Sequence, residues 1–186
     1  MREGETYDCP AAICIPIRDE ERRLPALMAR LATIQELTPN LLIALTFDGC
    51  RDAGWEVVQP FLAPSKIHAQ QIVRSKVPNA GRARAAAMSF GRDLLHQHFA
   101  EKSPGEFHLL STDADTIPDQ DWVRSARSNL AAVDLVAGLT RLDDTKCCPH
   151  RQRLEAYLER LHTIRRQTDP IDYDPAPSHP YIGGAN

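Results

Sequence analysis

The chain has 186 residues, of which 42% are hydrophobic and 25% are charged, so its composition is that of a globular protein and argues against disorder. This length suits one domain with a single core. The formal net charge is −3 and the sequence has no basic block, so we expect no nucleic-acid partner. No apolar run approaches the roughly 20 residues of a bilayer-spanning helix, so we also expect no transmembrane segment.

Apolar runs of strand length alternate with helical patterns up to about residue 140. The run AAICIPI (11–17) predicts a buried strand, and the leucine spacing of residues 19–37 predicts a helix after it. LLIALTF (41–47) predicts a second strand that ends in the turn-rich DGCRDAG. The remaining predicted elements are, in order, a weaker strand at 67–75, a helix at 79–99, a strand at 107–112, a helix at 119–133 and a strand at 134–140.

This alternation is typical of an open, mainly parallel sheet with helices on both faces, so we predict the α/β fold class. In such sheets ligands bind at the carboxyl ends of the strands. Polar residues follow three of the predicted strands: Arg18, Asp19, Glu20, Asp48, Asp52, Asp113 and Asp115. We therefore expect these residues to meet at one edge of the sheet and to form a ligand site there.

The segment after residue 140 has a different pattern. Residues 141–150 read as a loop, residues 151–167 as an amphipathic helix, and residues 168–186 as a proline-rich extended segment. The sequence given ends on YIGGAN without a helix or strand to close the domain, so we expect further sequence to follow.

The segment STDADT carries the clearest chemical signal. In an extended chain, Asp113 and Asp115 would point to the same side of the strand end. Two carboxylates there suit Mg²⁺ or Mn²⁺, which keep several waters and take further ligands from substrate phosphates. The alternative is that one aspartate caps the helix after Pro118 and the other is solvated. Because the pair follows an apolar strand, we predict a metal site at Asp113 and Asp115.

Five segments, taken in chain order, resemble the nucleotide-sugar-dependent glycosyltransferases of the GT-A fold, specifically the large family 2. They are CIPIRDEERRLPALMARL, LLIALTFDGCRDAG, NAGRARAAAMSFG, LLSTDADTIPDQDWV and YIGGAN. The resemblance covers nearly the whole chain and implies a Rossmann-like GT-A fold. It implies transfer of a sugar from a UDP- or GDP-sugar donor to a hydroxyl acceptor, with inversion as the outcome expected for family 2, and Mn²⁺ or Mg²⁺ as the cofactor.

The resemblance also implies roles for residues on the nucleotide side. The backbone around Pro16 and the side chains of Arg18 and Glu20 would line the nucleotide pocket, and Asp48 would face the base or ribose. The start of the 79–99 helix would approach the base or diphosphate through Gly81 and either Arg82 or Arg84. Without the resemblance, these two arginines read as exposed helix charges and Asp48 as a turn residue.

On the metal and acceptor side, the resemblance implies that Asp113 holds the ribose or a metal-bound water and that Asp115 binds the metal, with Ala114 between them. The acceptor floor would be formed by Gly183, Gly184, Ala185 and Asn186, a stretch that could otherwise be a flexible turn. Residues 1–140 would then be the nucleotide-sugar-binding half, and residues 141–186 the start of the acceptor-side region of the same single domain.

The sequence departs from the family pattern at Phe47 and Cys50, where relatives often have aspartate and serine. The general base of inverting relatives is an Asp or Glu after the Gly-Gly-Ala-Asn stretch, so we expect it beyond Asn186. This leaves a second hypothesis, a non-catalytic or truncated nucleotide-sugar-binding domain. A third is a haloacid-dehalogenase-like phosphohydrolase with Asp113 as nucleophile, but Ile117 breaks that motif, which also normally follows the first strand.

The cysteines and the N-terminus bear on the cellular compartment. The N-terminal sequence lacks the apolar core of a signal peptide, so we expect a cytoplasmic protein. Five cysteines, an odd number, favour free thiols in a reducing compartment. Cys147 and Cys148 are adjacent and have no second pair, which does not fit the spacing of structural zinc sites.

Overall fold

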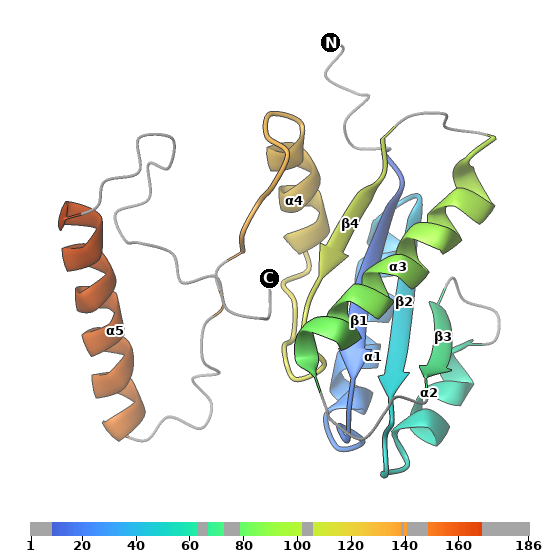
Figure 1. The fold of residues 1–186 in the computed structure, drawn as a ribbon, viewed down its shortest axis with the longest axis horizontal. Coiled ribbons are helices and arrows are strands. Elements are labelled where there is room, and N and C mark those ends of the chain that lie inside the picture. The colour runs from blue at the N-terminus through green and yellow to red at the C-terminus, as the bar shows by residue number, and fades with distance from the viewer. Residues whose placement is uncertain are drawn as a thin grey trace. The chain divides into compact units, whose positions relative to one another are not determined.

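The computed structural model describes residues 9–62, 67–72, 79–101, 106–138, 140 and 149–168. The chain divides after Val136 into two units. The first unit contains β1 (Ala11–Ile17), α1 (Leu24–Leu37), β2 (Leu41–Asp48), α2 (Gly54–Leu62), β3 (Ile67–Ile72), α3 (Ala80–Phe99), β4 (His108–Ser111) and α4 (Trp122–Leu130) (Figure 1). The described element of the second unit is α5 (Pro149–Thr168).

The strands of the first unit form a four-stranded parallel sheet in the order β3-β2-β1-β4. In the register, Cys14 of β1 lies opposite Ala44 of β2 on one side and Ser111 of β4 on the other. Strands that are covered on both faces read as continuous apolar runs, which is why AAICIPI and LLIALTF were recognisable. The sheet confirms the predicted α/β class.

Helices cover both faces of the sheet, as predicted. The odd-numbered residues of β1 and β2, from Ala11 to Phe47, pack with α1, Val58 of α2 and Val123 of α4. On the other face, Ala12, Cys14, Leu42 and Ala44 of the same strands pack with α3. Figure 1 shows α3 crossing one face of the sheet while α1 lies behind the other. The strand ends and the start of α3 therefore meet at one edge.

Small residues allow α3 to approach β1 and β2 closely. A Cβ atom added to Gly91 would lie 2.4 Å from the Sγ of Cys14, 3.3 Å from the Cβ of Ala12 and 3.6 Å from the Cβ of Ala44. Burial between helix and sheet raises the pKa of the Cys14 thiol to about 12. This contact fixes α3 over the centre of the sheet, and with it the position of the first turn of α3.

Two predicted elements need correction, and one helix was not predicted. Residues 134–138 and 140 form no strand, and Leu135 is 79% exposed. An apolar run becomes a strand only where a partner strand supplies its hydrogen bonds, and the described part of this segment pairs with none. The first helix begins at Leu24 instead of residue 19, because Glu20 and the next three residues form a turn that ends in the bond from the Leu24 N–H to the Glu20 carbonyl. α2, with Pro60 inside it, was not predicted.

The remaining predicted elements lie close to their expected positions. β3 ends at Ile72, and the rest of that predicted strand lies outside the described residues. α5 corresponds to the helix predicted at 151–167. Its residues Leu154, Tyr157 and Ile164 are exposed. The described cysteines Cys9, Cys14 and Cys50 are free thiols. Within the described ranges, none of the helices combines the length and the apolar character needed to cross a membrane.

Candidate functional site at the carboxyl edge of the sheet

The loops after β1 and β2 are joined by carboxylates that accept backbone hydrogen bonds from the opposite loop. Asp19 accepts from the Arg51 N–H at 2.6 Å, and Asp52 accepts from the Glu21 N–H at 2.7 Å. The Glu21 carboxylate in turn accepts from the Ala53 N–H at 2.9 Å. The predicted convergence of the polar residues after these two strands is therefore present.

Both loops contain a residue in the left-handed region. Asp19 has a φ of 53°, which aspartate tolerates better than most side chains, and Gly49 has a φ of 61°. The Gly49 N–H donates to the carbonyl of Ile72, the last residue of β3, at 3.2 Å. This bond holds Gly49, at the start of the second loop, against the end of β3. It thereby fixes the position of Cys50, the next residue of the loop.

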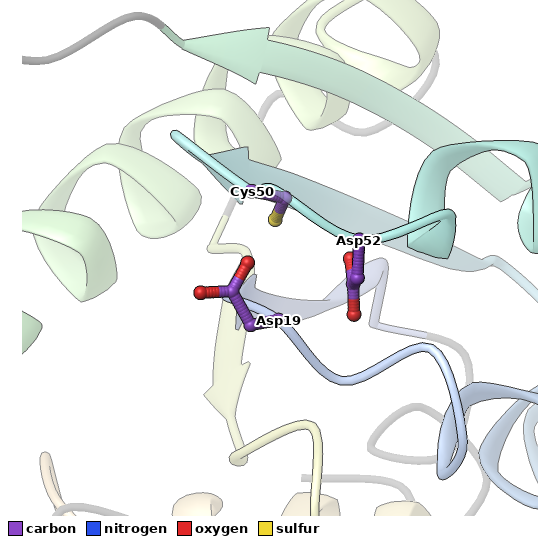
Figure 2. A group of neighbouring side chains, drawn as sticks. All are labelled: Asp19, Cys50 and Asp52. Carbon is purple, nitrogen blue, oxygen red and sulfur yellow. The ribbon is translucent and has the colours of Figure 1, made fainter.

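Figure 2 shows Asp19 on the first loop facing Cys50 and Asp52 on the second. One potential ligand atom from each of the three lies within 4.8 Å of the others. The Cys50 thiol donates to the Ile17 carbonyl at 3.3 Å, and burial raises its pKa. The group offers a thiol and two carboxylates to a cation, and both carboxylates also accept backbone N–H groups of the opposite loop. These hydrogen bonds hold the two loops together.

Replacing Asp52 with alanine should lower the free energy of unfolding by about 2 kcal/mol, because two backbone N–H groups lose their acceptor. They are those of Glu21, at 2.7 Å, and of Gly54, the first residue of α2, at 3.1 Å. Urea denaturation measures the change. Asp93→Ala is the control, since Asp93 is exposed and pairs with the adjacent Arg92, and it should change stability by less than about 0.5 kcal/mol. Equal losses in both variants would contradict the proposed role of Asp52.

An arginine of α3 reaches the end of β4. Asn79 caps α3 by accepting from the Arg82 N–H at 2.9 Å, which places Arg84 in the first turns of the helix. The Arg84 guanidinium donates to the Ser111 hydroxyl at 2.7 Å and to the Asp113 carboxylate at 2.5 Å. Arg84 therefore bridges the helix to the last residue of β4 and to the segment after it.

Asp113 and Asp115 lie in a turn, so the extended backbone that would point both to the same side is not present. The Thr116 N–H donates to the Asp113 carbonyl at 3.1 Å, and Ala114 between the aspartates is buried at 4% exposure. Asp113 is half-buried and Asp115 is exposed. Burial raises the pKa of Asp113, as does the charge of Asp115, while Arg84 lowers it; the net direction is upward.

Asp115 also lies near the loop after β1. Glu20 pairs with Arg23 at 2.6 Å, and this bond raises the pKa of Arg23, with a smaller contribution from the charge of Asp115. The Thr116 hydroxyl lies 3.5 Å from the Asp115 carboxylate. The loop after β1 and the turn after β4 thus place carboxylates and a guanidinium within electrostatic range of one another.

The other predicted residues occupy the same edge. Pro16 and Arg18 are half-buried at the end of β1, Asp48 is buried at the end of β2, and Gly81 and Arg82 are exposed in the first turn of α3. The predicted acceptor residues 183–186 lie outside the described residues.

Sequence reasoning missed two polar residues of this edge and saw a third only as a departure. Ser111 anchors Arg84, Arg23 pairs with Glu20, and Cys50 joins the aspartates of the first two loops. The sequence could have identified Ser111 as a site residue, because it lies two residues before Asp113 and side chains two positions apart along a strand share a face. Arg23 had none, since it stood in a run of charged residues that read as the surface of a helix.

No protein-family model and no curated protein matches the chain. Among solved structures, S. aureus TarS 1–349 in complex with UDP-GlcNAc matches with a TM-score of 0.48 and 15% identity, over 66% of this chain and 31% of that chain. A second structure of S. aureus TarS 1–349 matches with a TM-score of 0.49 and 16% identity, over 66% of this chain and 32% of that chain. The match thus spans about a third of the TarS chain.

Proposed function

We propose that the chain is the nucleotide-sugar-binding part of a GT-A glycosyltransferase of the family 2 type, which moves a sugar from a UDP- or GDP-sugar to a hydroxyl acceptor. One observation carries this proposal. At the carboxyl edge of the parallel sheet, Arg84 of α3 lies 2.5 Å from Asp113 of the DAD turn (residues 113–115), next to the N-terminus of α3. A helix N-terminus and an arginine suit a diphosphate, and a carboxylate pair suits the cation that accompanies it.

The donor set at the turn fits a divalent cation. Asp115 is exposed, and Asp113 pairs with Arg84 through one of its two carboxylate oxygens. Carboxylate oxygens are the ligands that Mg²⁺ and Mn²⁺ prefer. A cation held by Asp113 and Asp115 would neutralise the charge that develops on the departing diphosphate.

The remaining side chains supply recognition in this proposal. Asp48 would accept hydrogen bonds from the base or ribose at the end of β2, and Arg18 and Glu20 would line the pocket after β1. Arg82 is exposed in the first turn of α3 and would approach the diphosphate. The acceptor hydroxyl would attack the anomeric carbon from the face opposite the diphosphate, with inversion. We assign no general base to the described residues.

A non-catalytic nucleotide-sugar-binding domain is the second candidate. It remains a candidate because no general base is assigned to the described residues. The phosphohydrolase hypothesis receives no such support, because the DAD turn follows β4, an edge strand of the described sheet, and not the first strand. Donor hydrolysis or transfer by this chain would exclude the second candidate, since a non-catalytic domain would bind the donor without turnover.

A thermal-shift panel tests the proposed function. UDP or GDP with Mn²⁺ should raise the melting temperature, because a ligand at about 100 times its Kd stabilises the folded state by about 2.7 kcal/mol. ADP with Mn²⁺ serves as the base control, and EDTA should remove the metal-dependent part of the shift. UDP-GlcNAc belongs in the panel as an intact donor. If no nucleoside diphosphate shifts the transition with or without metal, the proposed function is wrong.

A further inference from the structure

The ion pair between Arg84 and Asp113 differs from other pairs in the described part of the chain. Three pairs join residues that are one or three positions apart: Arg23–Glu20, Arg92–Asp93 and Arg124–Asp121. Arg84 and Asp113 are 29 positions apart and come from different elements. Their side chains are only 19% and 34% exposed, so water screens this pair less than the surface pairs.

The guanidinium is also held in one orientation. One of its nitrogens donates to Ser111 at 2.7 Å while another donates to Asp113 at 2.5 Å. Ser111 is fixed by the pairing of β4 with β1, where it lies opposite Cys14. These two hydrogen bonds therefore hold the Arg84 guanidinium beside Asp113 in one orientation.

The Asp113 carboxylate already has a cationic partner. It is half-buried and pairs with the Arg84 guanidinium at 2.5 Å, and Asp115 follows it two residues later in the same turn. A divalent ion bound to the same carboxylate would take the place of the guanidinium, so the two compete for one partner.

We propose that Arg84 is a place-holder for the cation, and that metal and donor diphosphate bind cooperatively by separating the Arg84–Asp113 pair. Asp113 would then hold the cation, and the released Arg84 guanidinium would donate to the diphosphate. This inference rests on the proposed function for its ligands. The first ligand to bind bears the cost of separating the pair and the second does not, so each strengthens the binding of the other by the same factor.

The test measures Mn²⁺ binding in the absence of nucleotide, by electron paramagnetic resonance of the free ion. Arg84→Gln should bind Mn²⁺ about tenfold more tightly than the unaltered chain, because a charge-assisted hydrogen bond no longer competes. The same variant should bind UDP or GDP more weakly in saturating Mn²⁺, again by about tenfold. Arg92→Gln is the matched control: it removes the same charge from the exposed side of the same helix and should leave both affinities unchanged.

Two further measurements keep the test decisive. The gain in Mn²⁺ affinity should persist at about 0.5 M salt, where long-range repulsion by a lost charge is screened. If Arg84→Gln does not fold, as judged by circular dichroism, Ser111→Ala replaces it; loss of the anchor should then tighten Mn²⁺ binding about threefold, the effect of a partly weakened hydrogen bond.

Failure of the inference is distinguishable from failure of the function. Unchanged or weaker Mn²⁺ binding in Arg84→Gln would show that Arg84 does not compete with the cation for Asp113. The proposed function would still stand if the unaltered chain binds nucleoside diphosphates. Tighter Mn²⁺ binding without any nucleotide binding supports competition at Asp113 but overturns the transferase function and the cooperative step.

Discussion

Asp115→Ala is expected to abolish metal-dependent donor binding, with a loss of at least about 100-fold in affinity for UDP or GDP in Mn²⁺, since one carboxylate ligand of the cation is removed. Asp115 is exposed and its nearest described hydrogen-bond contact is the Thr116 hydroxyl at 3.5 Å. The fold should therefore tolerate the change. Isothermal titration calorimetry with and without Mn²⁺ measures the affinity, and urea denaturation checks stability.

The control for this experiment is Asp119→Ala, which removes an exposed carboxylate from the same segment after β4. Asp119 accepts from the Asp121 N–H at 3.0 Å and lies beyond the DAD turn. Its replacement should leave donor affinity unchanged. Equal affinity in the Asp115→Ala variant and the unaltered chain would remove the metal role from Asp115 and would favour a binding site that needs no cation.

Gly91→Leu is expected to lower the free energy of unfolding by about 3 kcal/mol or more, because the side chain must be inserted between α3 and the sheet. Its Cβ alone would lie 2.4 Å from the Cys14 Sγ and 3.3 Å from the Ala12 Cβ. Leucine is a good helix former, so the loss would report packing and not helix propensity. Since α3 carries Arg84, donor affinity should fall as well. Urea denaturation measures the first effect and calorimetry the second.

A double-mutant cycle identifies the contact responsible. Gly91→Ala alone should cost about 1 kcal/mol, the overpacking penalty less the gain in helix propensity. In a Cys14→Ala background the Sγ atom is gone and the nearest remaining neighbour of the new Cβ is Ala12, at 3.3 Å. The substitution should there become neutral or stabilising. Additive effects of the two substitutions would show that the Cys14 contact does not limit the approach of α3.

The sequence predicted best those elements whose apolar pattern follows directly from the burial of their own residues. β1 and β2 are apolar throughout because both faces are covered, and α1 has its buried leucines at helical spacing. α2 was missed because it is short, contains Pro60 and has only two fully buried residues, Gly54 and Val58. The predicted strand at 134–140 was wrong because its hydrogen bonds depend on a neighbouring strand, about which an apolar run carries no information.

The same division holds for the site. The sequence by itself determined that Asp19, Asp48, Asp52 and Asp113 would gather at one edge, because the carboxyl ends of parallel strands must lie together. Only the tertiary structure decided that Arg84 would pair with Asp113, 29 positions away, and that Asp52 would accept from Glu21, 31 positions away. Which side chains meet within hydrogen-bond distance depends on the close approach of α3 at Gly91 and on the turns at Asp19 and Gly49. Those contacts arise from packing between distant segments, which no local spacing encodes.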